Sequence, residues 1–182
     1  MNSEAYKNQV ALNRIGKDNF FKTNFQSPIP QEERANFIKL DYFDPDLKYK
    51  FELELEESNH KEKVKIEDTG GNLRDFLKWG KFTFEINKQE YVLFVYKSNE
   101  EETRLFVPFK DATSGKETYG AGRYIDLEEE KDKIENKWIL DFNFATNPWC
   151  AYSHNYVCPL IPFENILQVE IKAGEKTIKN RR

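Results

Sequence analysis

The sequence has few cysteines, no long apolar stretch and no excess of positive charge, and each absence argues against a class of protein. Only 2 of the 182 residues are cysteine, too few for the disulfide framework of a small secreted domain. No apolar run approaches the length of a membrane span, and residues 1–7 hold no apolar signal-peptide core. We therefore expect a cytoplasmic protein, outside the membrane, whose thiols are reduced.

Acidic residues slightly outnumber basic ones, and the net charge is −4. Charges of both signs are interspersed along the chain, which is typical of a solvated surface. The one concentration of positive charge lies at the C-terminus, and a short basic tail is more typical of a frayed chain end than of a phosphate-binding patch. Its residues are Lys176, Lys179, Arg181 and Arg182. The sequence therefore predicts no nucleic-acid partner.

The length of the chain is that of one domain with a sizeable core. We expect residues 1–182 to form a single domain. In it, a helical segment and connector cover 1–35, a β domain covers 36–176 and a basic tail covers 177–182. Aromatic residues make up 15% of the chain, so phenylalanine and tyrosine should supply much of the buried area.

Helical spacing of apolar residues is confined to the first part of the chain. Ser3–Phe21 predicts an amphipathic helix, either continuous or divided at Gly16, and Gln31–Arg34 predicts a further helical turn. From Phe37 onward the apolar residues alternate with period two. The expected strands cover 49–55, 64–66, 82–86, 91–96, 105–109, 124–127, 138–144 and 166–172. This pattern predicts a mainly β fold, either an antiparallel barrel or a two-layer sandwich, with an N-terminal helix.

A glycine-rich stretch over 109–127 is the first candidate site. Its glycines permit positive φ and close approach of backbone N–H groups to a ligand, and they are Gly115, Gly120 and Gly122. Arg123 could hold a carboxylate or phosphate with two parallel hydrogen bonds. The alternative is a β connection in which Asp111 and the hydroxyl residues bond to their own backbone.

The second candidate stretch covers 138–158. If 138–144 is a strand, Asp141 and Asn143 lie on one face, opposite Trp138 and Leu140. That polar face either lines a cavity or meets water. We expect Arg123 and Asp141 to share a pocket, because buried polar groups gain from a partner. The predicted ligand-binding residues are Asp111, Glu117, Tyr119, Arg123 and Asn143.

Cys150, His154 and Cys158 follow one another at intervals of four residues. On one helix face they would converge on a metal ion, but a structural zinc site needs a fourth ligand and usually closer pairs. We therefore predict no metal site. The same residues suggest a Cys/His nucleophile pair, for which Cys150 is the candidate, or buried packing groups. We expect both thiols to be free, with Cys150 the less buried.

At these stretches the chain resembles a family of bacterial and archaeal proteins classed as domain of unknown function 1684. The resemblance implies no activity, cofactor or catalytic residue. The family pattern carries both cysteines but does not require histidine at position 154, which weakens the zinc and Cys/His hypotheses. The motifs that carry the resemblance are Phe109–Tyr124, Leu140–Asn143, Asn147–Pro148, Cys150–Tyr152, Cys158–Leu160, Glu164–Asn165 and Ala173–Lys176.

Three functions stay open at this point. The leading hypothesis is a binding module whose polar pocket takes a small anionic ligand, without a cofactor. The second is a hydrolase or isomerase that uses Cys150 as nucleophile or Asp141 as general acid/base. The third is a structural or interaction protein without catalytic activity. The sequence makes no prediction of the oligomeric state.

Overall fold

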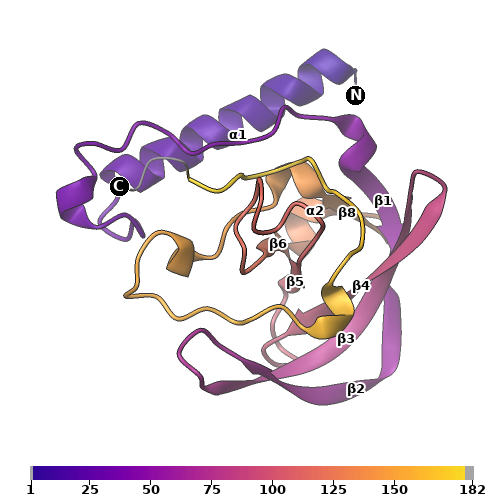
Figure 1. Cartoon of the computed structure of the whole chain (residues 1–182). Helices are drawn as coiled ribbons and strands as arrows, with labels where there is room; N and C mark the ends of the chain where they lie inside the picture. The colour runs from indigo at the N-terminus through magenta and orange to yellow at the C-terminus, as the bar shows by residue number, and fades with distance from the viewer. Residues whose placement is uncertain (1, 179–182) are drawn as a thin grey trace.

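In a computed structural model, which describes residues 2–178, the chain forms two antiparallel sheets and one long helix (Figure 1). The larger sheet has the order β2-β3-β4-β5-β6, and the smaller has the order β1-β8-β7. The strands are β1 (Lys50–Glu54), β2 (Glu56–Glu67), β3 (Leu73–Ile86), β4 (Gln89–Lys97), β5 (Leu105–Phe109), β6 (Arg123–Leu127), β7 (Lys133–Ile134) and β8 (Lys137–Asp141). Most of the basic tail predicted at 177–182 lies outside the described residues.

The other helical elements are short and lie mostly before β1 and after β8. They are the helix α2 (Glu129–Asp132) and the 3₁₀ helices Gln31–Glu33, Leu47–Tyr49, Phe142–Phe144, Trp149–Ala151 and Phe163–Asn165. The first of the 3₁₀ helices confirms the helical turn that the sequence predicts at Gln31–Arg34.

Both sheets contribute to one aromatic-rich core. Phe142 is fully buried, and its ring lies 6.0 Å from Phe51 of β1, 5.5 Å from Phe84 of β3 and 5.2 Å from Phe109 of β5. Such ring pairs stabilise a core beyond the area that they bury. The mainly antiparallel β fold is thus confirmed. In the described part of the chain the two sheets stay separate, so the arrangement is sandwich-like and a closed barrel is not confirmed.

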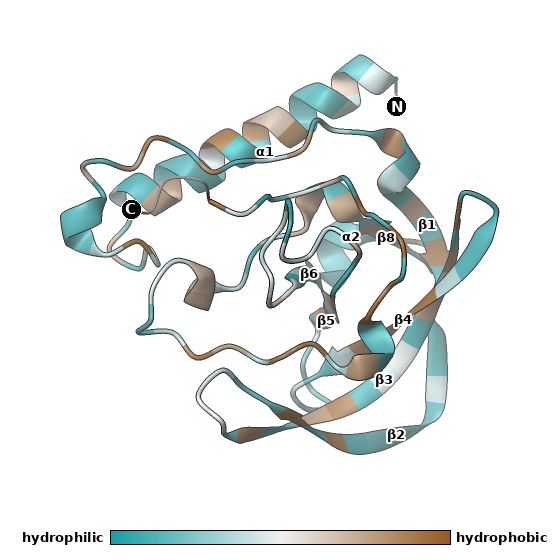
Figure 2. Cartoon of the chain, in the orientation of Figure 1, coloured by the Kyte–Doolittle hydropathy of each residue, from teal (hydrophilic) through white to brown (hydrophobic). Residues whose placement is uncertain are grey.

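Helix α1 (Ser3–Thr23) lies along one side of the β body (Figure 1). The Asn2 side chain caps it by accepting the N–H of Ala5 at 2.8 Å. The helix is continuous through Gly16, at which a Cβ would meet nothing within 4 Å. The helix is largely hydrophilic (Figure 2). Within residues 2–178, no helix is both long and apolar enough to cross a membrane.

The strands expected over 82–86 and 91–96 are present and form the hairpin β3–β4. Asn87 and Lys88 have φ values of 53° and 64°, as the two central residues of a tight hairpin turn require. Ile86 pairs with Gln89 directly beside the turn. The alternation of apolar residues therefore sets this pairing locally.

One of the predicted strands is too long, and another is absent. The strand predicted over 138–144 ends at Asp141, because the Asp141 carboxylate accepts the N–H of Asn143 at 3.0 Å and caps the 3₁₀ helix Phe142–Phe144. The stretch 166–172 forms no strand. It runs beside the loop that follows β5, where Leu167 N–H donates to the Lys110 carbonyl at 2.8 Å, and only an isolated bridge joins the two segments.

Candidate functional site

A folded loop brings Cys150 and Cys158 together. Pro148 precedes the 3₁₀ helix Trp149–Ala151, and the rings of Trp149 and Tyr156 meet edge to face at 5.1 Å across the loop. The backbone N–H of Cys150 donates to the sulfur of Cys158 at 3.4 Å. Both thiols are free, with Cys150 half-buried and Cys158 buried, which is the predicted order of exposure.

The main chain of Cys158 is fastened to the turn between β2 and β3. Its N–H donates to the Thr69 hydroxyl at 3.1 Å, and its carbonyl accepts the Thr69 N–H at 2.9 Å. Arg74 donates to the Val157 carbonyl at 2.9 Å and pairs with the buried Asp68 at 2.8 Å. These contacts hold Cys158 against a rigid hairpin and bring a positive charge near its sulfur.

The glycine-rich segment reaches the same place. The hydroxyl of Tyr119 hydrogen-bonds to the side chain of Cys150, and Gly122 lies so close to Ile161 that a Cβ would be 2.5 Å from Ile161 Cγ1. The two candidate stretches of the sequence therefore meet at the cysteine pair. A chain of donors runs from Tyr119 through the Cys150 thiol to the sulfur of Cys158.

This arrangement gives the two thiols different pKa values. The pKa of Cys158 is lowered to about 6, first by the hydrogen bond with Cys150 and then by the backbone N–H groups of Cys150 and Trp149 and the charge of Arg74; burial opposes the change. The pKa of Cys150 is raised, first by its hydrogen bond with Cys158 and then by burial. The pair therefore loses its first proton more readily than an ordinary thiol, and the N–H of Cys150 that points to the Cys158 sulfur favours the negative charge there.

Arg123 is fully buried and bound to internal groups. Its guanidinium pairs with Asp111 at 3.3 Å and donates to the backbone carbonyls of Ile171, at 3.0 Å, and Ala173. Asp111 in turn accepts the N–H of Ile171 at 2.6 Å. The pair fastens the segment 171–173 to the glycine-rich loop, and burial lowers the pKa of Arg123 while Asp111 opposes that change.

Asp141 and Asn143 belong to a different network beneath α1. The Tyr6 hydroxyl donates to the Asp141 carboxylate at 2.8 Å, and the Asn143 side-chain amide donates to it at 2.9 Å. Within residues 2–178 no hydrogen bond joins this network to Arg123 or Asp111. The structure therefore does not bring Arg123 and Asp141 together in the way that the sequence analysis expects, because the chain turns into a 3₁₀ helix after Asp141 and faces the helix α1.

The remaining predicted residues lie apart. Glu117 is half-exposed at the surface, 3.8 Å from Lys172. His154 is exposed, and in the part of the chain that the structure describes no three histidine, cysteine, aspartate or glutamate residues gather as metal ligands. The four-residue spacing does not bring His154 to the cysteines, because 150–158 folds as a loop and not as a helix.

Sequence reasoning missed Glu175 as well as Thr69 and Arg74. Glu175 is fully buried. Its carboxylate accepts hydrogen bonds from the Lys17 ammonium at 2.7 Å and from the Asn147 side-chain amide at 3.0 Å. Burial raises the pKa of Glu175, and Lys17 opposes the rise. No periodic signal marks these residues, because each acts through a segment distant in sequence.

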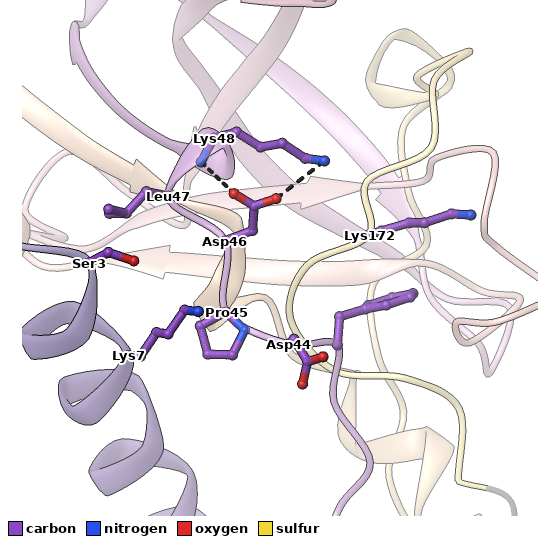
Figure 3. A pocket seen from close by; sticks show the side chains of 9 residues that line it. Ser3, Lys7, Asp44, Pro45, Asp46, Leu47, Lys48 and Lys172 are labelled. Carbon is purple, nitrogen blue, oxygen red and sulfur yellow. Dashed lines mark hydrogen bonds and ion pairs between the residues drawn. The ribbon is translucent and has the colours of Figure 1, made fainter.

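A surface pocket of about 490 Å³ lies between the start of α1 and the segment before β1. Figure 3 shows Lys7, Lys48 and Lys172 around it, together with Asp44 and Asp46. Lys48 pairs with Asp46 at 3.2 Å, and Lys172 pairs with Glu170 at 3.1 Å. Asn143 supports the wall of the pocket from behind, since its side chain bonds to the backbone N–H and carbonyl of Asp46, each at 2.9 Å.

Comparison with known proteins gives a family and a fold. The profile of a family described as "Protein of unknown function (DUF1684)" matches residues 35–176. The solution NMR structure of an uncharacterised protein from Haloarcula marismortui is 38% identical to this chain, with a TM-score of 0.72, over 96% of each chain. No curated protein matches the chain. The matched range includes Cys150, Cys158 and the glycine-rich segment.

Proposed function

This chain belongs to the DUF1684 family of proteins of unknown function, and we propose that its activity depends on a reactive thiolate at Cys158. The observation that supports this proposal is that the Cys150 thiol and the Cys150 backbone N–H both face the Cys158 sulfur. Hydrogen bonds of this kind favour the ionised form, which is the nucleophilic form of cysteine. The nucleophile thus moves from Cys150, the sequence candidate, to Cys158.

The surroundings of Cys158 limit the reaction that it can perform. A hydrolase that uses cysteine usually takes a proton from the thiol with a histidine. His154 is exposed, and among the described residues it does not gather with the two thiols as a cluster of metal ligands. Cys158 needs no such base, because its ordinary state near neutral pH is already the thiolate. Asp141 is an unsuitable general base, since Tyr6 and Asn143 occupy its carboxylate oxygens.

Alkylation with iodoacetamide tests this proposal through its pH dependence. Cys158 should react half-maximally near pH 6, the value to which its pKa is lowered. The reaction should slow as the pH falls through that value, because the thiol form predominates below it. At pH 6 we expect Cys158 to react on the order of tenfold or more faster than an ordinary thiol with pKa about 8.5.

Two variants separate the thiols in this experiment. Cys158→Ser should leave only slow alkylation that rises above pH 8. Cys150→Ala should keep the reactive cysteine but shift its profile to higher pH, because alanine has no side-chain donor for the Cys158 sulfur. Unfolded protein in denaturant serves as the reference for ordinary thiols. Equal, slow alkylation of both cysteines in the folded protein would contradict the proposal and leave them as packing residues.

Binding of a small anionic ligand is a second candidate function, and the lysine-lined pocket favours it. Lys7 carries no ion pair among the described residues, and the pairs of Lys48 and Lys172 are exposed and therefore weak. An anion with two or more charges could draw the three ammonium groups together. Arg123 is not required in this form of the hypothesis.

Thermal unfolding in inorganic phosphate or citrate tests this second candidate. A ligand at ten times its dissociation constant should stabilise the protein by about 1.4 kcal/mol, which is about 3–6 °C in Tm for a chain of this size. The double variant K7A/K48A should lose this shift, whereas Lys22→Ala, on the same helix but outside the pocket, should retain it. A shift that survives in K7A/K48A would exclude the pocket as the binding site.

A further inference from the structure

We infer that Cys150 and Cys158 form a reversible redox pair, in which a small peroxide oxidises Cys158 and Cys150 then closes a disulfide. This inference rests on the proposed thiolate and adds the class of its substrate. It assigns Cys150 a role of its own, that of the resolving thiol.

The geometry of the loop carries the inference. The backbone nitrogen of Cys150 lies 3.4 Å from the Cys158 sulfur, and its N–H donates to that sulfur. Cys150 is half-buried in a short 3₁₀ helix, and Cys158 is buried. The nearest reactive neighbour of Cys158 is therefore a second thiol, whose reaction with an oxidised cysteine is disulfide formation.

The reaction balances with hydrogen peroxide as the oxidant. The Cys158 thiolate attacks one peroxide oxygen and breaks the O–O bond, which gives a sulfenic acid and a hydroxide ion that takes up a proton to become water. The Cys150 sulfur then attacks the Cys158 sulfur, the S–O bond breaks, and the hydroxyl leaves as water with the Cys150 proton. Two electrons pass from the sulfurs to the peroxide, and one disulfide and two water molecules result.

The burial of the pair favours a small oxidant over a protein disulfide. Only 8% of the surface of Cys158 is exposed to solvent. The Tyr119 hydroxyl of the glycine-rich segment lies beside its partner Cys150. A protein disulfide needs direct access of a second chain to the attacking sulfur, which this burial denies. A peroxide is little larger than two water molecules, so the small exposed part of Cys158 favours it over a protein as the oxidant.

Peroxide titration of the whole chain tests the inference. The protein is reduced, freed of reductant and treated with one equivalent of hydrogen peroxide near neutral pH, and free thiols are then counted in denaturant. We expect both thiols to disappear together, a Cys150–Cys158 peptide link by mass spectrometry without chain dimers, and full recovery with dithiothreitol. Because the chain has only 2 cysteines, the number of free thiols per chain measures the oxidation of this pair directly.

Serine variants identify the role of each sulfur. Cys150→Ser should stop at a sulfenic acid on Cys158 that dimedone traps, and Cys158→Ser should consume peroxide on the order of tenfold more slowly. Oxidation of wild-type Cys158 to sulfinic acid, or cross-linked dimers without the internal disulfide, would overturn the inference. If low-pH alkylation of Cys158 stays fast in such a protein, only the redox pairing fails; if alkylation is slow, the proposed thiolate fails with it.

Discussion

Replacement of Arg123 by methionine is expected to lower the free energy of unfolding by about 3–5 kcal/mol, the usual cost of removing one partner of a buried ion pair. The substitution leaves the Asp111 carboxylate buried without its cation and leaves the carbonyls of Ile171 and Ala173 without their donor. Urea unfolding followed by circular dichroism would measure the change. Arg123→Lys keeps the charge but not the planar fork, so it should restore part of the loss.

A matched control distinguishes burial from charge. Arg104 pairs with Asp126 at 3.6 Å, with both side chains about half-exposed, and Arg104→Met should cost less than about 1 kcal/mol. If R123M instead unfolds like the wild type and loses only the binding of an anion, then Arg123 is a ligand residue after all, as the sequence analysis expects, and the internal role described here is wrong.

Gly122→Ala should be the second strongly destabilising change. Gly122 has φ = 101°, and a Cβ there would lie 2.7 Å from the Phe109 carbonyl oxygen and 2.5 Å from Ile161 Cγ1. We expect about 1–2 kcal/mol from the backbone conformation and about 1–3 kcal/mol more from displacing these neighbours. Because Gly122 holds the glycine-rich segment against the loop of Cys158, low-pH alkylation should slow as well.

Gly71→Ala provides the comparison for this prediction. Gly71 also has a positive φ, 81°, but a Cβ there would meet nothing within 4 Å. Its substitution should therefore carry only the backbone cost of about 1–2 kcal/mol. Equal losses of unfolding free energy in the two variants would refute the close approach at Gly122, and denaturant unfolding of both proteins decides between these results.

The local elements of the fold could be predicted from sequence because their causes are local. The alternation around Phe82–Ile86 and Tyr91–Tyr96 specifies a hairpin by itself, and the helical spacing after Asn2 specifies α1. The strand predicted over 166–172 is absent because the alternating apolar residues of this stretch pack against the core without a partner strand. Its backbone bonds go to Lys110 and Ala112, and a period of two does not reveal which partner a segment meets.

The candidate site could likewise be predicted from the sequence only in part. The cysteines, Tyr119 and the glycines stand out by residue type, so the sequence could identify all of them as candidate site residues. It could not show which of the two thiols is ionised. The lowered pKa of Cys158 depends first on Cys150 and the backbone N–H groups of its loop, and only then on the charge of Arg74 in β3. Spacing along the chain did not reveal it, because the fold of the loop 150–158 decides which groups face the sulfur.

The sequence by itself determined the mainly β class, the N-terminal helix, the aromatic core and membership of the family, because these follow from composition, periodicity and motifs along the chain. Only the tertiary structure decided what the polar residues do. It buried Arg123 with Asp111 inside the protein, turned Asp141 toward Tyr6 and brought Cys150 to Cys158. The physical reason is that a charge or thiol takes its character from the groups within a few ångströms, and those groups are brought there by distant parts of the chain.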